Sequence, residues 1–160
     1  MRYIIRRRFS LRTDPVFLAE GGDQRYRVVH SLAGFGFKMT VQDSAGNAVV
    51  TMRHRGHGEW EVREDNKFFA RIQQGQIVTK DRKTINVASN LFATHVEFTG
   101  EGGTVAILTK PFLKHPFSAH TELNILDQRF ERIAVAGSIA ALNIRHELWE
   151  GSSDNVHTMH

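Results

Sequence analysis

Residues 131–149 read ERIAVAGSIAALNIRHELW, and their middle part, residues 133–142, contains no charged side chain. Only Gly137 and Ser138 interrupt its apolar residues. A helix that is apolar on every side needs dry surroundings on every side. A bilayer does not fit, because a membrane span takes about 20 apolar residues and Glu131, Arg132 and Arg145 would enter the hydrocarbon. The stretch therefore predicts a helix enclosed by protein.

The predicted helix runs from Phe130 to Trp149, with Asp127 as its N-cap and Gly151 just past its end. Small residues keep it thin enough to fit inside a barrel of strands; they are Ala134, Ala136, Gly137, Ser138, Ala140 and Ala141. The side chains that we expect to be buried include Ile133, Ala140 and Ile144. Residues 152–160 are polar and are expected to form a flexible tail.

Most of the sequence before this helix alternates apolar and polar residues with a period of two, which is typical of β-strands. Four stretches share the pattern strand, acidic or glycine-rich turn, strand: FLAEGGDQRYRV (17–28), VQDSAGNAVVTM (41–52), VREDNKFFARI (62–72) and VEFTGEGGTVAI (96–107). About 12 short strands are too many for a flat open sheet of this size, and closure removes exposed edges. We therefore predict a mainly β fold, a closed antiparallel barrel of about 12 strands around the C-terminal helix, in one domain over residues 1–151.

The chain has 160 residues, a formal net charge of +4 and no cysteine, so disulfides and thiolate chemistry are excluded. Its first residues, MRYIIRRRFSLR, contain too short an apolar run for a signal peptide and no cleavage site. We therefore expect a cytoplasmic protein without a transmembrane segment, with peripheral association at a membrane left open. The net positive charge permits attraction to phosphate-bearing partners.

The opening MRYIIRRRFSLRTDPVFLAEGGDQRYRVVHSLAGFGFKMTVQDSAGNAV resembles the LURP-one-related branch of the tubby C-terminal superfamily. The shared features are the Met-Arg-Tyr start with a basic strand, the aromatic-glycine stretch Phe35–Phe37 and the Asp-x-x-Gly turn Asp43–Gly46. The resemblance implies a tubby-like barrel around a central helix, related in fold to phospholipid scramblases. It also implies headgroup binding as an expectation, because tubby domains bind phosphoinositides through basic residues on the barrel. Scrambling is not expected, since the proline-rich leader and the acylated cysteines are missing.

The usual catalytic motifs are absent, including the G-x-S-x-G elbow, the P-loop and the H-E-x-x-H helix. We therefore expect no enzyme activity, no catalytic residue and no cofactor. Two pairs of histidines have H-x-x-H spacing, His54 with His57 and His157 with His160. Arginines flank His54 and would repel a cation, and a complete set of ligands is missing. No metal site is predicted.

The basic residues form the candidate site, because the planar fork of arginine suits phosphate. Arg6 and Arg8 share one face of the first strand, and further basic residues would join them if their hairpins were neighbours. The hypothetical phosphate-binding set consists of Arg6, Arg8, Arg25, Arg27, Arg53, Arg55 and Lys110. The alternative is that these charges only keep strand faces hydrated and protect strand edges.

We accordingly predict a non-enzymatic binding or scaffold module that recognises anionic phosphate groups such as phospholipid headgroups, phosphoinositides included. The alternative is a small-ligand binder or enzyme that uses a pocket at a barrel mouth. Nucleic acid is disfavoured, because the aromatic residues that could stack on bases among basic residues are limited to Tyr3, Tyr26 and Phe37. The sequence identifies no protein partner.

Overall fold

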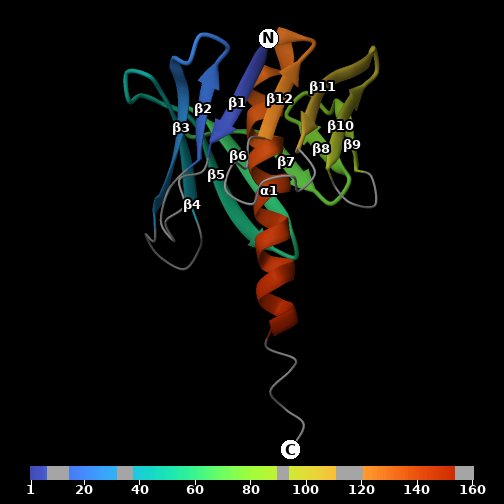
Figure 1. The fold of residues 1–160 in the computed structure, drawn as a ribbon. Coiled ribbons are helices and arrows are strands. Elements are labelled where there is room, and N and C mark those ends of the chain that lie inside the picture. The colour runs from blue at the N-terminus through green and yellow to red at the C-terminus, as the bar shows by residue number, and fades with distance from the viewer. Residues whose placement is uncertain (7–14, 32–37, 90–93, 111–120, 154–160) are drawn as a thin grey trace, which may run out of the picture.

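The computed structural model describes residues 1–6, 15–31, 38–89, 94–110 and 121–153, with residues 143–153 described by their backbone only. Twelve strands form one closed antiparallel barrel (Figure 1). Each strand pairs with the next in sequence, and β1 pairs with β12 to close the ring. The predicted mainly β barrel of about twelve strands is therefore confirmed. The strands are β1 (Arg2–Arg6), β2 (Val16–Ala19), β3 (Gln24–Ser31), β4 (Lys38–Asp43), β5 (Ala48–Gly56), β6 (Glu59–Glu64), β7 (Lys67–Gln73), β8 (Gln76–Thr79), β9 (Thr84–Ser89), β10 (His95–Gly100), β11 (Gly103–Thr109) and β12 (Thr121–Ile125).

The four similar stretches of sequence form the hairpins β2–β3, β4–β5, β6–β7 and β10–β11, as predicted. Each of these hairpins contains a shift of the pairing register, at Phe17/Leu18, Val41/Gln42, Val62/Arg63 and Phe98/Thr99. Such a bulge adds one residue to one strand, increases the local twist and changes the direction of a side chain. The repeated bulges help short strands to curve into a closed ring.

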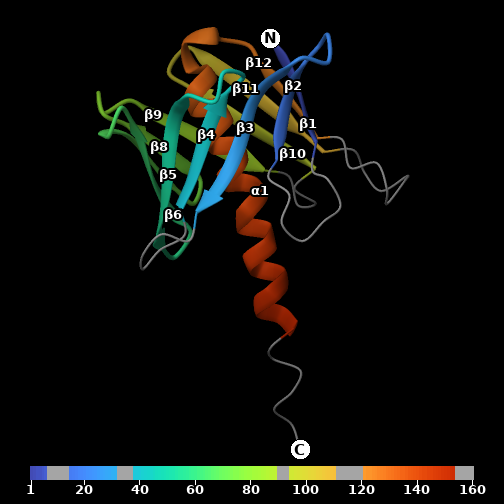
Figure 2. The ribbon, with the colours of Figure 1, turned by 90° about the vertical axis from the view of Figure 1, so that its left-hand side faces the viewer.

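The helix begins at the same end of the barrel as the chain, and this end is called the upper end, as it is drawn in Figure 1. After β12 the chain forms a short 3₁₀ turn, η1 (Gln128–Phe130), and then α1 (Glu131–Ser153). Asp127 caps η1, because its carboxylate accepts a hydrogen bond from the Arg129 backbone N–H at 3.1 Å. Figures 1 and 2 show α1 running down through the ring of strands and leaving it at the lower end.

The predicted end of the helix is wrong. The helix continues beyond Trp149 to Ser153, so Gly151 lies inside it and not past its end. A single glycine costs a helix only about 1 kcal/mol relative to alanine, which is too little to stop it reliably. Ser152 and Ser153 therefore belong to the helix and not to the predicted tail. The rest of that tail and the Ile144 side chain lie outside what the structure describes.

The enclosed position of the helix is confirmed by burial. Every residue from Ile133 to Ala140 is buried, although these residues point in all directions around the helix axis. At Gly137 the strands approach so closely that an added Cβ would lie 2.6 Å from Phe98 Cε1. The largest side chains that fill the rest of the lumen are fully buried: Trp60, Tyr3, Phe17 and Phe98. Within the described residues, no helix combines the length and hydrophobicity that a membrane crossing requires.

Candidate anion-binding site

The outer faces of β5, β6 and β7 display a concentration of arginines. Met52, Val62 and Ala70 point into the core, so the residues that alternate with them face outward. The outward charged residues on these strands are Arg53, Arg55, Glu59, Glu61, Arg63 and Arg71. Cations therefore outnumber anions on this side of the barrel.

These side chains are organised around one carboxylate. Glu61 on β6 lies directly opposite Arg53 on β5 and directly opposite Arg71 on β7. Its Oε2 accepts a hydrogen bond from Arg55 Nη2 at 2.7 Å, and its Oε1 accepts one from Arg63 Nε at 2.5 Å. We call Glu61 and the arginines at 53, 55, 63 and 71 the Glu61 arginine cluster.

The cluster stays charged and partly open to solvent. The Arg63 guanidinium, followed by that of Arg55, holds the pKa of the Glu61 carboxyl below its ordinary value. The Glu61 side chain is 15% exposed, whereas the side chains of Arg55 and Arg63 are 42% and 45% exposed. Each guanidinium has five N–H donors, and Glu61 uses only some of them. Arg63 Nη1 donates instead to the Asn66 backbone carbonyl at 3.3 Å.

A further cation lies beside the cluster. Lys38 on β4 pairs in register with Arg53 on β5, so two like charges lie directly opposite each other, which destabilises a sheet. Within the described part of the chain, neither of them forms an ion pair, whereas Arg71 pairs with Glu59 at 3.2 Å. In the described ranges, this part of the sheet therefore contains two adjacent like charges that form no ion pair, beside Glu61. Figure 2 turns strands β3, β4 and β5 toward the viewer.

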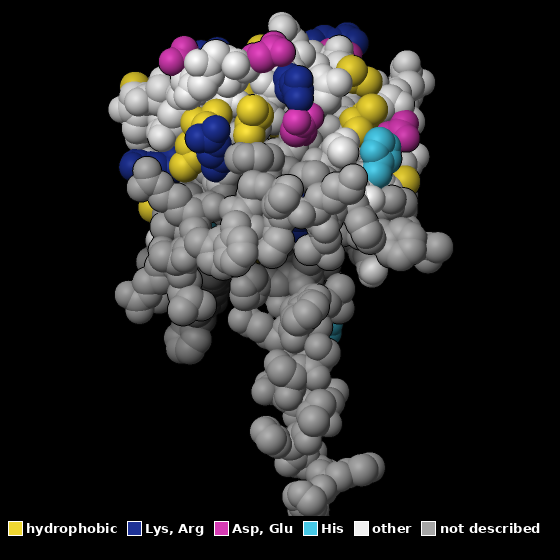
Figure 3. Space-filling model, in the orientation of Figure 1, with side chains coloured by type: hydrophobic (Ala, Val, Ile, Leu, Met, Phe, Trp, Pro, Cys, Tyr) yellow, Lys and Arg dark blue, Asp and Glu magenta, His cyan; other side chains and the backbone are white. Residues whose placement is uncertain are grey.

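The opposite side of the barrel has a different character. Figure 3 shows Lys and Arg side chains interspersed with Asp and Glu over the described surface of that side. One such pair joins the strands that close the barrel, since Arg2 on β1 donates to Glu122 on β12 at 2.7 Å. Exposed ion pairs of this kind add little to stability and leave no excess charge.

The described members of the predicted phosphate-binding set do not form a single site. Arg53 and Arg55 lie in the Glu61 arginine cluster. Arg27 lies two strands away on β3, where it donates to Gln42 Oε1 at 2.8 Å. Arg25 is the extra residue of the bulge in the β2–β3 hairpin, which turns it toward the Tyr3 hydroxyl at the upper end.

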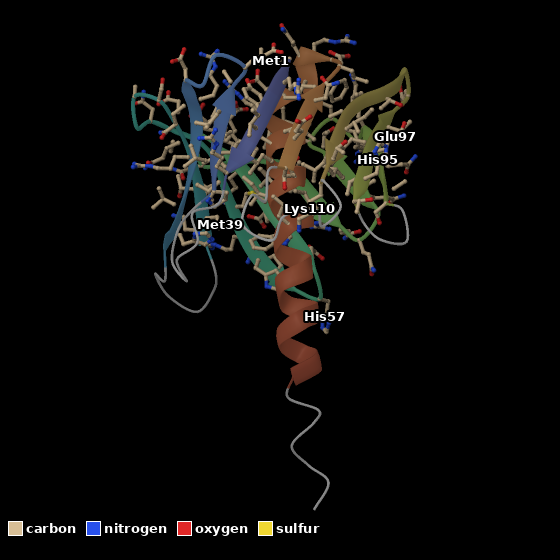
Figure 4. All side chains as sticks on the ribbon, in the orientation of Figure 1. Met1, Met39, His57, His95, Glu97 and Lys110 are labelled. Carbon is tan, nitrogen blue, oxygen red and sulfur yellow. The ribbon has the colours of Figure 1, made fainter. Side chains whose placement is uncertain are left out.

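The remaining predicted residues lie at the lower end of the barrel or outside the described residues. Arg6 is the last residue of β1, and Lys110 follows β11 directly. Figure 4 shows Lys110 well below Met1, which marks the upper end. Arg8 lies outside the described residues. The predicted set is thus divided among the cluster, the upper end, the lower end and β3.

Sequence reasoning missed Arg63 and Arg71, and it gave no role to Glu61. A signal was present in the residues 59–64, EWEVRE, because their period-two pattern places Glu59, Glu61 and Arg63 on the same outward face. Pairing this strand with the preceding one would have placed these charges beside Arg53 and Arg55.

A network of neutral and charged groups ties the start of α1 to the barrel at the upper end. The hydroxyls of Tyr3 and Tyr26 donate to the same oxygen, Glu131 Oε1, at 2.5 and 2.8 Å. Burial and these hydrogen bonds raise the pKa of both phenols, that of Tyr26 to about 12. Arg132 forms an ion pair with Glu64 at the same end. The network fixes the helix in the barrel and leaves Tyr3 fully buried.

This burial rules out one of the aromatic residues considered for base stacking. Tyr3 is inaccessible to a base, and Tyr26 packs edge-on against Tyr3 and Phe17. Phe37 lies outside the described residues. Stacking of nucleic acid bases requires exposed ring faces, so the fully buried Tyr3 offers no such platform. Phe68 on β7, which pairs in register with Arg63, is 40% exposed.

Of the histidines at 54 and 57, only His54 belongs to β5, because that strand ends at Gly56. The His54 ring packs against the Trp60 ring, with 4.8 Å between the centroids. His57 lies in the exposed β5–β6 turn near the lower part of the barrel (Figure 4). In the described ranges, no three side chains of His, Asp or Glu gather as a metal site. His157 and His160 lie outside these ranges.

The upper end also contains a pocket of about 280 Å³. The β8–β9 turn, the β10–β11 turn and η1 surround it, with charges of both signs from Lys83, Glu101, Asp127 and Arg129. Asp127 and Arg129 bind each other, with Oδ2 and Nη2 2.7 Å apart. The pocket is polar and lies at a barrel mouth, where the sequence allowed a small-ligand site.

The comparisons with known proteins agree with this architecture. An X-ray structure of a protein from Arabidopsis thaliana is similar in fold, with a TM-score of 0.63 and 15% sequence identity over 91% of this chain and 90% of that chain. No curated protein matches the sequence. The family model described as LURP-one-related matches residues 1–115. The chain therefore belongs to the LURP-one-related family.

Proposed function

We propose that this protein is a non-enzymatic binding module that recognises anionic phosphate groups, such as those of phospholipid headgroups, through the Glu61 arginine cluster. The observation that supports this proposal most strongly is the arrangement of Arg53, Arg55, Arg63 and Arg71 around one carboxylate on one outer face. Guanidinium groups bind phosphate oxygens through parallel hydrogen bonds. The cluster lies on the outside of the barrel, because α1 and the core side chains fill the lumen.

The uncompensated charge beside Glu61 supports the same proposal. A sheet gains nothing from opposing Lys38 and Arg53 directly, whereas an anion bound between them would turn repulsion into attraction. A membrane surface with anionic lipids attracts each nearby Lys or Arg by about 1 kcal/mol. Because each contribution is small, several cations on one face must contact the membrane surface at the same time to bind it.

The test is co-sedimentation with phosphatidylcholine vesicles, with and without a phosphoinositide, at low and high salt. Wild-type protein is expected to bind the phosphoinositide vesicles at low salt and to be released at high salt, because exposed charges are screened. The double variant Arg53→Gln with Arg55→Gln should lose about 2 kcal/mol, or about 30-fold in affinity.

Two further double variants make the test specific. Arg2→Gln with Arg129→Gln removes the same amount of charge from other exposed positions and should retain binding. Arg6→Ala with Arg8→Ala tests the cluster that the N-terminal sequence suggested. Absence of binding at low salt, or equal losses in all three variants, would contradict recognition by the Glu61 arginine cluster.

A second candidate function is the binding of a small ligand in the pocket at the upper end, which is favoured by its charged lining. A ligand with both a cationic and an anionic group would complement Lys83 and Glu101. A thermal-shift screen of zwitterionic metabolites tests this candidate. A stabilising compound whose effect disappears in Lys83→Ala would support it, and the absence of any such compound would argue against it.

A further inference from the structure

The carboxylate at the centre of the cluster already uses both of its oxygens. Glu61 Oε2 accepts from Arg55 Nη2 at 2.7 Å and from Arg55 Nε at 3.2 Å, while Oε1 accepts from Arg63 Nε. Arg53 lies directly across the ladder from Glu61 but forms no ion pair with it. Among the described residues, one carboxylate therefore engages two arginines, while a third arginine lies opposite it in the ladder without an ion pair.

We infer that Glu61 is an internal competitor that makes this face selective for phosphate monoesters over phosphate diesters. This inference rests on the proposed function. In the free protein, Glu61 holds the guanidinium groups of Arg55 and Arg63 in the place where a phosphate binds. A ligand binds only when its interactions with these arginines are more favourable than those of the Glu61 carboxylate.

The chemistry of the two phosphate classes differs in this respect. A monoester has three terminal oxygens and a charge of about −1.5 to −2 at neutral pH. It can therefore engage Arg53 in addition to the two arginines that Glu61 holds. A diester has two free oxygens and a single charge, like the carboxylate. It therefore gains no binding free energy when it replaces Glu61. The same monoester group occurs on lipid headgroups and on free metabolites.

The test compares the two esters on equal terms. Vesicles of phosphatidylcholine contain either phosphatidic acid, a monoester, or phosphatidylglycerol, a diester, in amounts that give the same zeta potential. Wild-type protein is expected to bind the monoester vesicles at least about fivefold more tightly, the effect of one additional charge contact at the surface. Calorimetry with soluble glycerol 3-phosphate and with its diester glycerophosphoglycerol distinguishes a free metabolite from a lipid headgroup as the ligand. Selective binding in solution shows that a free phosphate monoester suffices. Selective binding on vesicles alone shows that a lipid surface is required.

Removal of the competitor should relax the selectivity. Glu61→Gln retains the shape and weakens the hold on Arg55 and Arg63, so diester binding should rise more than monoester binding and the ratio should fall toward one. The control Glu122→Gln removes one carboxylate from the opposite face, where it pairs with Arg2. It should raise both affinities slightly and leave the ratio unchanged.

A second variant tests the inference at Arg53, which forms no ion pair with any residue that the structure describes. Arg53→Gln should reduce monoester binding to the diester level, because only the monoester uses the third arginine. Equal binding of both esters by wild-type protein, or equal ratios in Glu61→Gln and Glu122→Gln, would overturn the inference and leave the proposed function standing. Binding of neither ester at low salt would overturn both.

Discussion

Replacement of Gly137 by alanine tests the enclosure of the helix at its tightest point. The new Cβ would lie 2.6 Å from Phe98 Cε1 and 3.0 Å from Ile77 Cδ1, and Phe98 is only 1% exposed. Forcing a methyl group into a packed core costs about 1–3 kcal/mol, and alanine returns about 1 kcal/mol of helix propensity relative to glycine. We expect a net destabilisation of about 1 kcal/mol. In an exposed helix, the same substitution is usually stabilising.

Urea unfolding followed by circular dichroism measures this difference. At a slope of about 2 kcal/mol/M, the midpoint should fall by about 0.5 M. Gly102→Ala is the matched control, because nothing lies within 4 Å of its Cβ. In the double variant Gly137→Ala with Phe98→Leu, the loss should be smaller than the sum of the single losses by about 0.5 kcal/mol or more, since contacting residues couple. Stability equal to or above wild type in Gly137→Ala, with additive effects in the cycle, would refute the packing described for the helix.

The remaining predictions concern the helix and its attachment at the upper end. Ala140→Arg should abolish soluble expression, because Ala140 is 1% exposed and an unpaired charge would be buried; Leu126→Arg, at a position 54% exposed, should express normally. Glu131→Ala should lower the free energy of unfolding by about 2 kcal/mol in urea titrations, because two tyrosine hydroxyls lose their acceptor, whereas Glu131→Gln should cost clearly less. The pKa of Tyr26 is raised from 10.0 to about 12, so the folded state favours the protonated phenol. The resulting contribution to the free energy of unfolding is complete below pH 10 and is lost as the pH rises toward 12. Unfolding midpoints at pH 8 and pH 11 should therefore differ less in Tyr26→Phe than in wild type, and an unchanged difference would exclude this titration as a cause.

Much of the fold could be predicted because buried positions recur in the sequence with the period of the secondary structure. The alternation in the hairpins specified which residues face the core, and Met39 and Val41 are buried as their pattern indicates. The uncharged run at the centre of the helix identified the enclosed element. Its C-terminal end was not predictable, because Gly151 has too weak a preference against helix to determine where α1 stops.

The candidate site was only partly predictable, because it depends on pairing register. Arg53 and Arg55 were included in the hypothetical phosphate-binding set from their residue type alone. Their meeting with Glu61 depends on the alignment of β5 with β6 and on the bulge at His54/Gly56, where Arg55 is the extra residue. Periodicity within one strand does not encode a bulge or the neighbour across the ladder. The same limit explains why Arg25, which follows the polar pattern of its strand, turns instead toward Tyr3 at a bulge.

The most direct test of the central claim is to observe the arginines while an anion binds. Arginine side-chain Nε–Hε resonances can be followed by NMR during titration with glycerol 3-phosphate at low salt. The Glu61 arginine cluster predicts saturable shifts for Arg53, Arg55 and Arg63, with Arg2 and Arg129 unchanged. Saturable shifts confined to Arg2, Arg129 or other arginines outside the cluster, or no saturable shift at any arginine, would contradict the claim that this face binds phosphate.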